Sequence, residues 1–147
     1  MMKIISSSFL NNAKIPSKYT CDGENISPPL EFIDVPTRTI SLVLIVDDPD
    51  APSNTWVHWV VYNIDPKVKK VKENSVPNGA VLGMTDFGKP GWGGPCPPSG
   101  SHRYFFKLYA LDKILDLPEG ITKHQLLEKM TDHVVEQAQL IGVYSQK

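Results

Sequence analysis

The sequence lacks the features by which several classes of protein are recognised. It contains only two cysteines, Cys21 and Cys96, in 147 residues, too few for the disulfide framework of a small secreted domain. Its longest apolar run, residues 42–46, has about a quarter of the length that a membrane-spanning helix needs. Positive charge is not in excess, since 15 Lys and Arg stand against 16 Asp and Glu. We therefore expect no nucleic-acid partner and no membrane span.

What remains is the composition of an ordinary globular domain. Hydrophobic residues make up 41% and charged residues 21%, which excludes general disorder. At about 150 residues per domain, residues 1–147 are predicted to form one domain with one sizeable core. The N-terminus shows no apolar segment of signal-peptide length, so we expect a cytoplasmic protein.

The two cysteines fit two different states. A bridge between Cys21 and Cys96 stays open, because composition does not determine pairing. Two mostly buried free thiols in a reducing cytosol are the commoner arrangement. The sequence therefore favours free thiols.

Strand-like segments dominate the first three quarters of the chain. Residues 41–46 form a β-branched run, and residues 56–64 are aromatic and β-branched throughout. Both faces of the second segment are apolar, which predicts a central strand covered on two sides. A third strong strand is expected over residues 102–110, with weaker strands near residues 3–7 and 68–73.

One helix is predicted near the C-terminus. Thr122 and Gln125 match a capping box, with Thr122 as the N-cap. Apolar residues then follow at helical spacing: Leu126, Leu127, Met130, Val134, Val135, Ala138 and Ile141. Gly142 is expected to end this helix. Strands followed by one late helix predict a mostly-β domain with the helix packed on it.

A long loop is predicted between residues 78 and 101. Its segment 88–100 is rich in glycine and proline, and proline cannot donate to a sheet ladder. Structureless segments of this length inside a compact domain are usually functional or disordered. Trp92 and the flanking strands favour an ordered, packed loop.

Four polar side chains around this loop form a candidate binding site: Asp48, His58, His102 and Tyr104. Alternation along the strand 56–64 predicts one common face for Trp56, His58, Val60 and Tyr62. His102 and Tyr104 likewise share a face of their strand. Imidazole groups and the amides of a glycine-rich loop donate to phosphate or carboxylate oxygens, so the set suits a small anion.

Each of these residues also has a purely structural interpretation. His58 fits a core histidine with one hydrogen bond, His102 fits a strand end in solvent, and Asp48 fits an ordinary turn. The motifs of common enzymes are missing, since the sequence has no Cys-x-x-Cys, no His-Glu-x-x-His and no Gly-x-Ser-x-Gly. We therefore expect no metal site, no cofactor and no enzyme.

Three motifs occur in order along the chain: Asp48-Pro49-Asp50-Ala51-Pro52, Trp56-Val57-His58-Trp59, and Gly94-Pro95 leading to Gly100-Ser101-His102-Arg103-Tyr104. With the segments 21–30 and 85–88, they resemble the phosphatidylethanolamine-binding protein family, most closely its prokaryotic, Raf-kinase-inhibitor-like branch. The resemblance spans residues 5–142. It implies a large antiparallel β-sheet with Greek-key-type connections, a second smaller sheet and short peripheral helices.

The resemblance also implies a ligand cavity formed by these positions: Asp48, His58, Gly94, Pro95, His102 and Tyr104. Gly94 and Pro95 would form its rim. Asp50, Pro52 and Arg103 would give structural support, with Arg103 bracing the loop by hydrogen bonds. Cis peptide bonds are implied between residues 51 and 52 and between residues 54 and 55. The two cysteines fall in separate motifs, which argues against a bridge.

The function that the resemblance implies is the binding of a small phosphorylated or carboxylate anion, with modulation of a kinase or a protease. A hydrolase of phosphorylated or acyl substrates stays open, with His58 or His102 as general base, Asp48 orienting it and Tyr104 donating to an oxyanion. An interaction scaffold with a vestigial pocket stays open as well. No nucleophile is evident, which favours binding over catalysis. A homodimer is expected, as in prokaryotic relatives.

Overall fold

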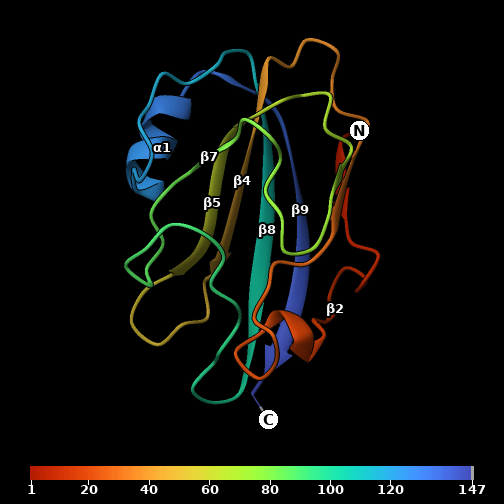
Figure 1. The fold of residues 1–147 in the computed structure, drawn as a ribbon, viewed down its shortest axis with the longest axis vertical. Helices are drawn as coiled ribbons and strands as arrows, with labels where there is room; N and C mark the ends of the chain where they lie inside the picture. The colour runs from red at the N-terminus through yellow and green to blue at the C-terminus, as the bar shows by residue number, and fades with distance from the viewer. Residues whose placement is uncertain (147) are drawn as a thin grey trace.

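The computed structural model describes residues 1–146 and consists mainly of two β-sheets (Figure 1). The larger sheet has the strand order β2 (Ala13–Lys14), β9 (Val134–Ser145), β8 (Ser101–Leu111), β4 (Ser41–Asp48), β5 (Trp56–Ile64) and β7 (Val81–Leu82). The smaller sheet has the order β1 (Lys3–Ile5), β3 (Leu30–Ile33) and β6 (Lys70–Val71). All neighbouring strands are antiparallel except β2 and β9. The predicted mostly-β fold with a large and a small sheet is confirmed.

The strands with the strongest sequence patterns were predicted correctly. The predicted strand 56–64 coincides with β5, which is buried on both faces over most of its length. The predicted strand 102–110 lies within β8. β4 runs two residues beyond the apolar segment 41–46, because Asp47 and Asp48 also pair with β5.

The predicted C-terminal helix is correct only in its first half. α1 (Lys123–Met130) begins after Thr122 with both hydrogen bonds of the capping box. It ends at Met130, and Asp132 adopts a left-handed backbone conformation with φ 70°. Residues Val134–Ser145 then form β9, which pairs with β8 along its length. The helical spacing of apolar residues beyond Met130 was therefore misleading, because pairing with a long neighbouring strand outweighed it.

Gly142 lies inside β9 and does not end a helix. A Cβ atom at this position would collide with side-chain atoms of Ile15 and Phe9. The close approach of the N-terminal segment to β9 therefore requires glycine here.

The core has two parts, one on each face of the larger sheet. One part packs between the two sheets and includes Trp59 and Phe106. The other lies beneath α1 and includes Val60, Tyr62 and Leu126. In Figure 1, α1 flanks the β4, β5 side of the sheet, and β8 and β9 lie side by side along it. Within residues 1–146 no helix is long and apolar enough to cross a membrane.

Candidate functional site

A β-bulge in β5 determines where His58 points. Val46 pairs with Trp59, and the next residue of β4, Asp47, pairs with Val57. His58 is therefore an extra residue with no partner of its own in β4. The bulge places the imidazole at the end of the sheet where β4 meets the loop to β5.

The bulge also changes which side chains share a face. The His58 ring lies 5.2 Å from the Tyr104 ring, measured between centroids. Trp56 lies on this side as well, where both Trp56 and His58 line one cavity. Val60 and Tyr62 instead pack beneath α1 on the opposite face. The predicted common face of four residues is wrong for these two, because the alternation shifts at the bulge.

Two adjacent carboxylates at the end of β4 point to opposite faces of the sheet. Asp48 accepts a hydrogen bond from His102 Nδ1 at 2.7 Å, and their side chains are only 4% and 8% exposed. Asp47 accepts from Lys107 Nζ at 3.1 Å and from Lys123 Nζ at 2.7 Å. Lys123 is the first residue of α1. Asp48 therefore serves the cavity, and Asp47 attaches α1 to the sheet.

The four polar candidates meet in one cavity of about 270 Å³. Its lining residues are Asp48, Ala51, Pro52, Trp56, His58, Phe87, Cys96, Pro97, Pro98, His102 and Tyr104. Phe87 packs edge-on against both the His58 and the Trp56 rings, at 5.3 Å and 5.6 Å between centroids. The cavity thus joins a polar floor to an apolar wall of aromatic rings and prolines.

Sequence reasoning did not identify most of this apolar wall. Phe87 lies in a segment that the resemblance had marked only as a match, and Pro97 and Pro98 come from the glycine- and proline-rich loop. The glycine- and proline-rich composition indicated a functional loop, but which of its side chains face the cavity depends on the tertiary fold.

Gly94 and Pro95 lie buried behind the cavity, outside its lining. The Gly94 amide donates to Asn25 Oδ1 at 2.9 Å, and the Pro95 carbonyl accepts from the Cys21 amide at 3.1 Å. A Cβ at Gly94 would collide with the backbone of Tyr19. These two residues therefore fix the loop against the segment 17–25.

Arg103 and Asp50 brace the turn between β4 and β5. Arg103 Nε and NH2 each donate to the Asp50 carboxylate at 2.9 Å, and the Arg103 amide adds a third bond of 2.9 Å. The hydrogen bonds from Arg103 lower the pKa of Asp50 to about 2. Pro52 of the same turn lines the cavity.

The predicted cis peptide bonds are absent within residues 1–146. Both the bond before Pro52 and the bond between Asn54 and Thr55 are trans. The turn from β4 to β5 occupies residues 49–55, which is long enough to reverse the chain with trans bonds alone.

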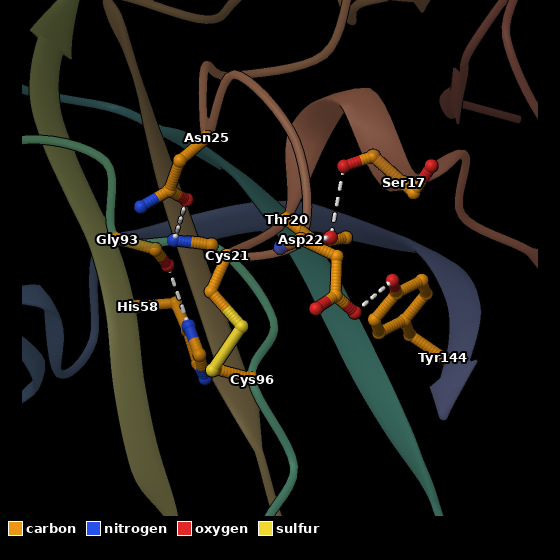
Figure 2. Close-up of a disulfide and its surroundings, with 10 residues drawn as sticks. Ser17, Thr20, Cys21, Asp22, Asn25, His58, Gly93, Cys96 and Tyr144 are labelled. Carbon is orange, nitrogen blue, oxygen red and sulfur yellow. Dashed lines mark hydrogen bonds between the residues drawn. A yellow bond between two sulfur atoms is a disulfide. The ribbon is translucent and has the colours of Figure 1, made fainter. Parts of the chain in front are cut away.

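The prediction of free thiols is wrong. Cys21 and Cys96 form a disulfide, with Cα atoms 5.5 Å apart, across 75 residues of sequence (Figure 2). Both cysteines are exposed. The loop folds over the segment 17–25 through the backbone contacts of Gly94 and Pro95, and this brings the two cysteines within bonding reach. Pairing of this kind depends on loop packing that the spacing of the cysteines does not show.

Two side chains of the cavity floor, His58 and Tyr104, have pKa values shifted toward their uncharged forms. His58 Nδ1 donates to the Gly93 carbonyl at 2.6 Å (Figure 2), and burial lowers the pKa of the ring below 6.5. The unprotonated Nε2 is then an acceptor. Burial also raises the pKa of the Tyr104 hydroxyl, which stays protonated. Within residues 1–146 no group of three or more potential ligands could hold a metal ion.

Comparisons with known proteins by family model, by sequence and by structure agree with one another. The family model described as phosphatidylethanolamine-binding protein matches residues 5–145. A UPF0098 protein of Methanothermobacter thermautotrophicus is 53% identical, over 97% of this chain and 98% of its own length. A solved structure from Chlamydia trachomatis, described as a homolog of that family, is 46% identical with a TM-score of 0.96, covering 99% and 98% of the two chains. E. coli YbcL is 30% identical with a TM-score of 0.92, covering 99% of both.

Proposed function

Because the chain belongs to the phosphatidylethanolamine-binding protein family, we propose that its cavity binds a small phosphorylated or carboxylate anion. The observation that carries this proposal is the convergence of His58, His102 and Tyr104 in one cavity beside the paired carboxylate of Asp48. A volume of about 270 Å³ suits a phosphate or a small phosphorylated head group better than a large cofactor.

The hydrogen-bonding groups of the floor favour an anion. His102 donates from Nδ1 to Asp48, which leaves Nε2 facing a ligand. The protonated Tyr104 hydroxyl is a donor. Neutral His58 gains a donor only by taking up a proton at Nε2. Anion binding is therefore coupled to proton uptake, and affinity is expected to rise as the pH falls.

The apolar wall would contact a second, less polar part of the ligand. Trp56, Phe87 and the three prolines of the lining offer surface to an uncharged or cationic portion of a small molecule, or to the chain of a phosphorylated side chain. We also propose that the protein modulates a kinase or a protease through such a ligand. We further propose that it is cytoplasmic and forms a homodimer.

A hydrolase is the second candidate, because one observation favours it. The Asp48–His102 pair has the geometry of a carboxylate that orients a general base. Tyr104 would donate to the developing oxyanion, and an attacking water would replace the missing nucleophile.

The test is a heteronuclear NMR titration with inorganic phosphate and with phosphoethanolamine, at a pH of about 7. Saturable shifts at His58 and His102 are expected, together with loss of binding in His102→Ala. The matched control is His133→Ala, because His133 Nδ1 donates to Asp112 at 2.8 Å outside the cavity. Equal binding by both variants contradicts the proposed cavity.

Turnover distinguishes the two candidates. A generic phosphate ester and a generic carboxyl ester are incubated with the protein and with His102→Ala. Hydrolysis that disappears in the variant identifies an enzyme, and saturable binding without turnover identifies a binding protein.

A further inference from the structure

We propose that the Cys21–Cys96 disulfide is a redox switch of the ligand cavity, so that its reduction weakens anion binding without unfolding the domain. This inference rests on the proposed function of the cavity. Cys96 and the two residues that follow it, Pro97 and Pro98, line the cavity. Both cysteines are exposed, so the bond is open to an attacking thiolate.

The loop before Cys96 is held without the disulfide. Trp92 Nε1 donates to the Tyr19 carbonyl at 3.3 Å, and the Gly94 amide donates to Asn25 Oδ1 at 2.9 Å. The Pro95 carbonyl accepts from the amide of Cys21 at 3.1 Å. These three bonds keep residues 92–95 in place whatever the state of the two sulfur atoms.

The segment after Pro95 depends on the disulfide. Within the described part of the chain, residues 97–100 form no backbone–backbone hydrogen bond, and pairing resumes only at Ser101 in β8. The Cys96 amide also interacts with the Tyr104 hydroxyl, so the end of this segment next to Pro95 keeps one contact without the disulfide. Reduction therefore frees the segment that carries Pro97 and Pro98, two residues of the cavity wall.

Cys21 is the fixed end of the bond. Its neighbour Asp22 accepts a hydrogen bond from the Tyr144 hydroxyl at 2.5 Å (Figure 2), which ties the segment to β9. Lys18 pairs with Glu73 at 2.8 Å on the other side. The disulfide thus connects the anchored segment 17–25 to residues 96–100, which few other contacts hold, and its cleavage lets these residues move.

The chemical step is thiol–disulfide exchange with a dithiol reductant. One thiolate of the reductant attacks a cysteine sulfur, the S–S bond breaks, and a mixed disulfide forms. The second thiol of the reductant then releases the protein cysteine and closes its own disulfide. The protein gains two electrons and two protons, which the reductant loses.

The test compares the full chain in its oxidised form with the same chain reduced by dithiothreitol, which is uncharged and does not compete for an anion site. Phosphate and phosphoethanolamine affinities are measured by NMR titration at one pH. If residues 96–100 hold the binding geometry about a tenth of the time after reduction, affinity falls about tenfold. The control is Cys21→Ser with Cys96→Ser, which is expected to bind like the reduced chain and to ignore dithiothreitol.

The outcomes separate this inference from the proposed function. Weaker binding with amide shifts confined to residues 17–25 and 96–104 supports the switch. Equal affinity of the two forms overturns the switch and leaves the anion site standing. Loss of the β4 and β8 signals on reduction also overturns it, since the change is then global. Absence of binding in both forms overturns the site and the switch together.

Discussion

Removal of the disulfide is expected to lower the free energy of unfolding by about 4.5 kcal/mol at about 25 °C. The bond closes a loop across 75 residues of sequence. In the chain-entropy description, such a cross-link restricts the unfolded chain, and the effect grows with the logarithm of loop length. The folded sheets contribute little to this difference, because the main contacts of residues 17–25 and 92–95 persist without the bond.

The assay is urea unfolding of the oxidised chain, the reduced chain and the double variant Cys21→Ala with Cys96→Ala. The m-value is expected to rise when the bond is absent, because the unfolded state then exposes more surface. The melting temperature is expected to fall by about 10 to 15 °C for a domain of this size. A loss below about 1 kcal/mol, with an unchanged m-value, refutes the loop-closure reasoning.

Three further changes test the fold and the site. Asp47→Ala is expected to lower the free energy of unfolding by about 1 to 3 kcal/mol in urea, because Lys123 loses a buried partner; phosphate binding should not change, and a loss of binding contradicts the separation of the two carboxylates. Gly142→Val should destabilise by about 1 to 3 kcal/mol through collision with Ile15, and wild-type stability in thermal unfolding refutes this packing. Burial lowers the pKa of His58 below 6.5, so the unfolded state binds more protons as the pH falls below about 6.5 and stability decreases there. Urea unfolding between about pH 7.5 and 5.5 checks this, and His58→Gln should reduce the slope.

What could be predicted from the sequence depended mainly on local signals. β5 and β8 are recognisable because their own residues are β-branched and aromatic, and the capping box of α1 lies within four residues. The polar candidates Asp48, His58, His102 and Tyr104 were also identified, and the structure brings all four to one cavity.

What could not be predicted depends on distant parts of the chain. β9 is a strand because β8 offers it a long partner, whereas its own apolar spacing resembles a helix. The disulfide requires the loop to fold over residues 17–25, and the apolar wall requires Phe87 to turn toward His58. None of these contacts can be recognised from the spacing, along the sequence, of the residues that make it.

The bulge in β5 has a consequence for how such a cavity is gained or lost. Trp56 and Val57 lie on opposite faces, and Trp59 and Val60 repeat that alternation. A chain lacking only residue 58 would therefore keep every later core residue of β5 on its present face. The imidazole occupies an insertion that the hydrophobic core does not need. One codon added or removed can therefore convert this scaffold between a form with the ring and a form without it, with the packing on both sides of the sheet retained.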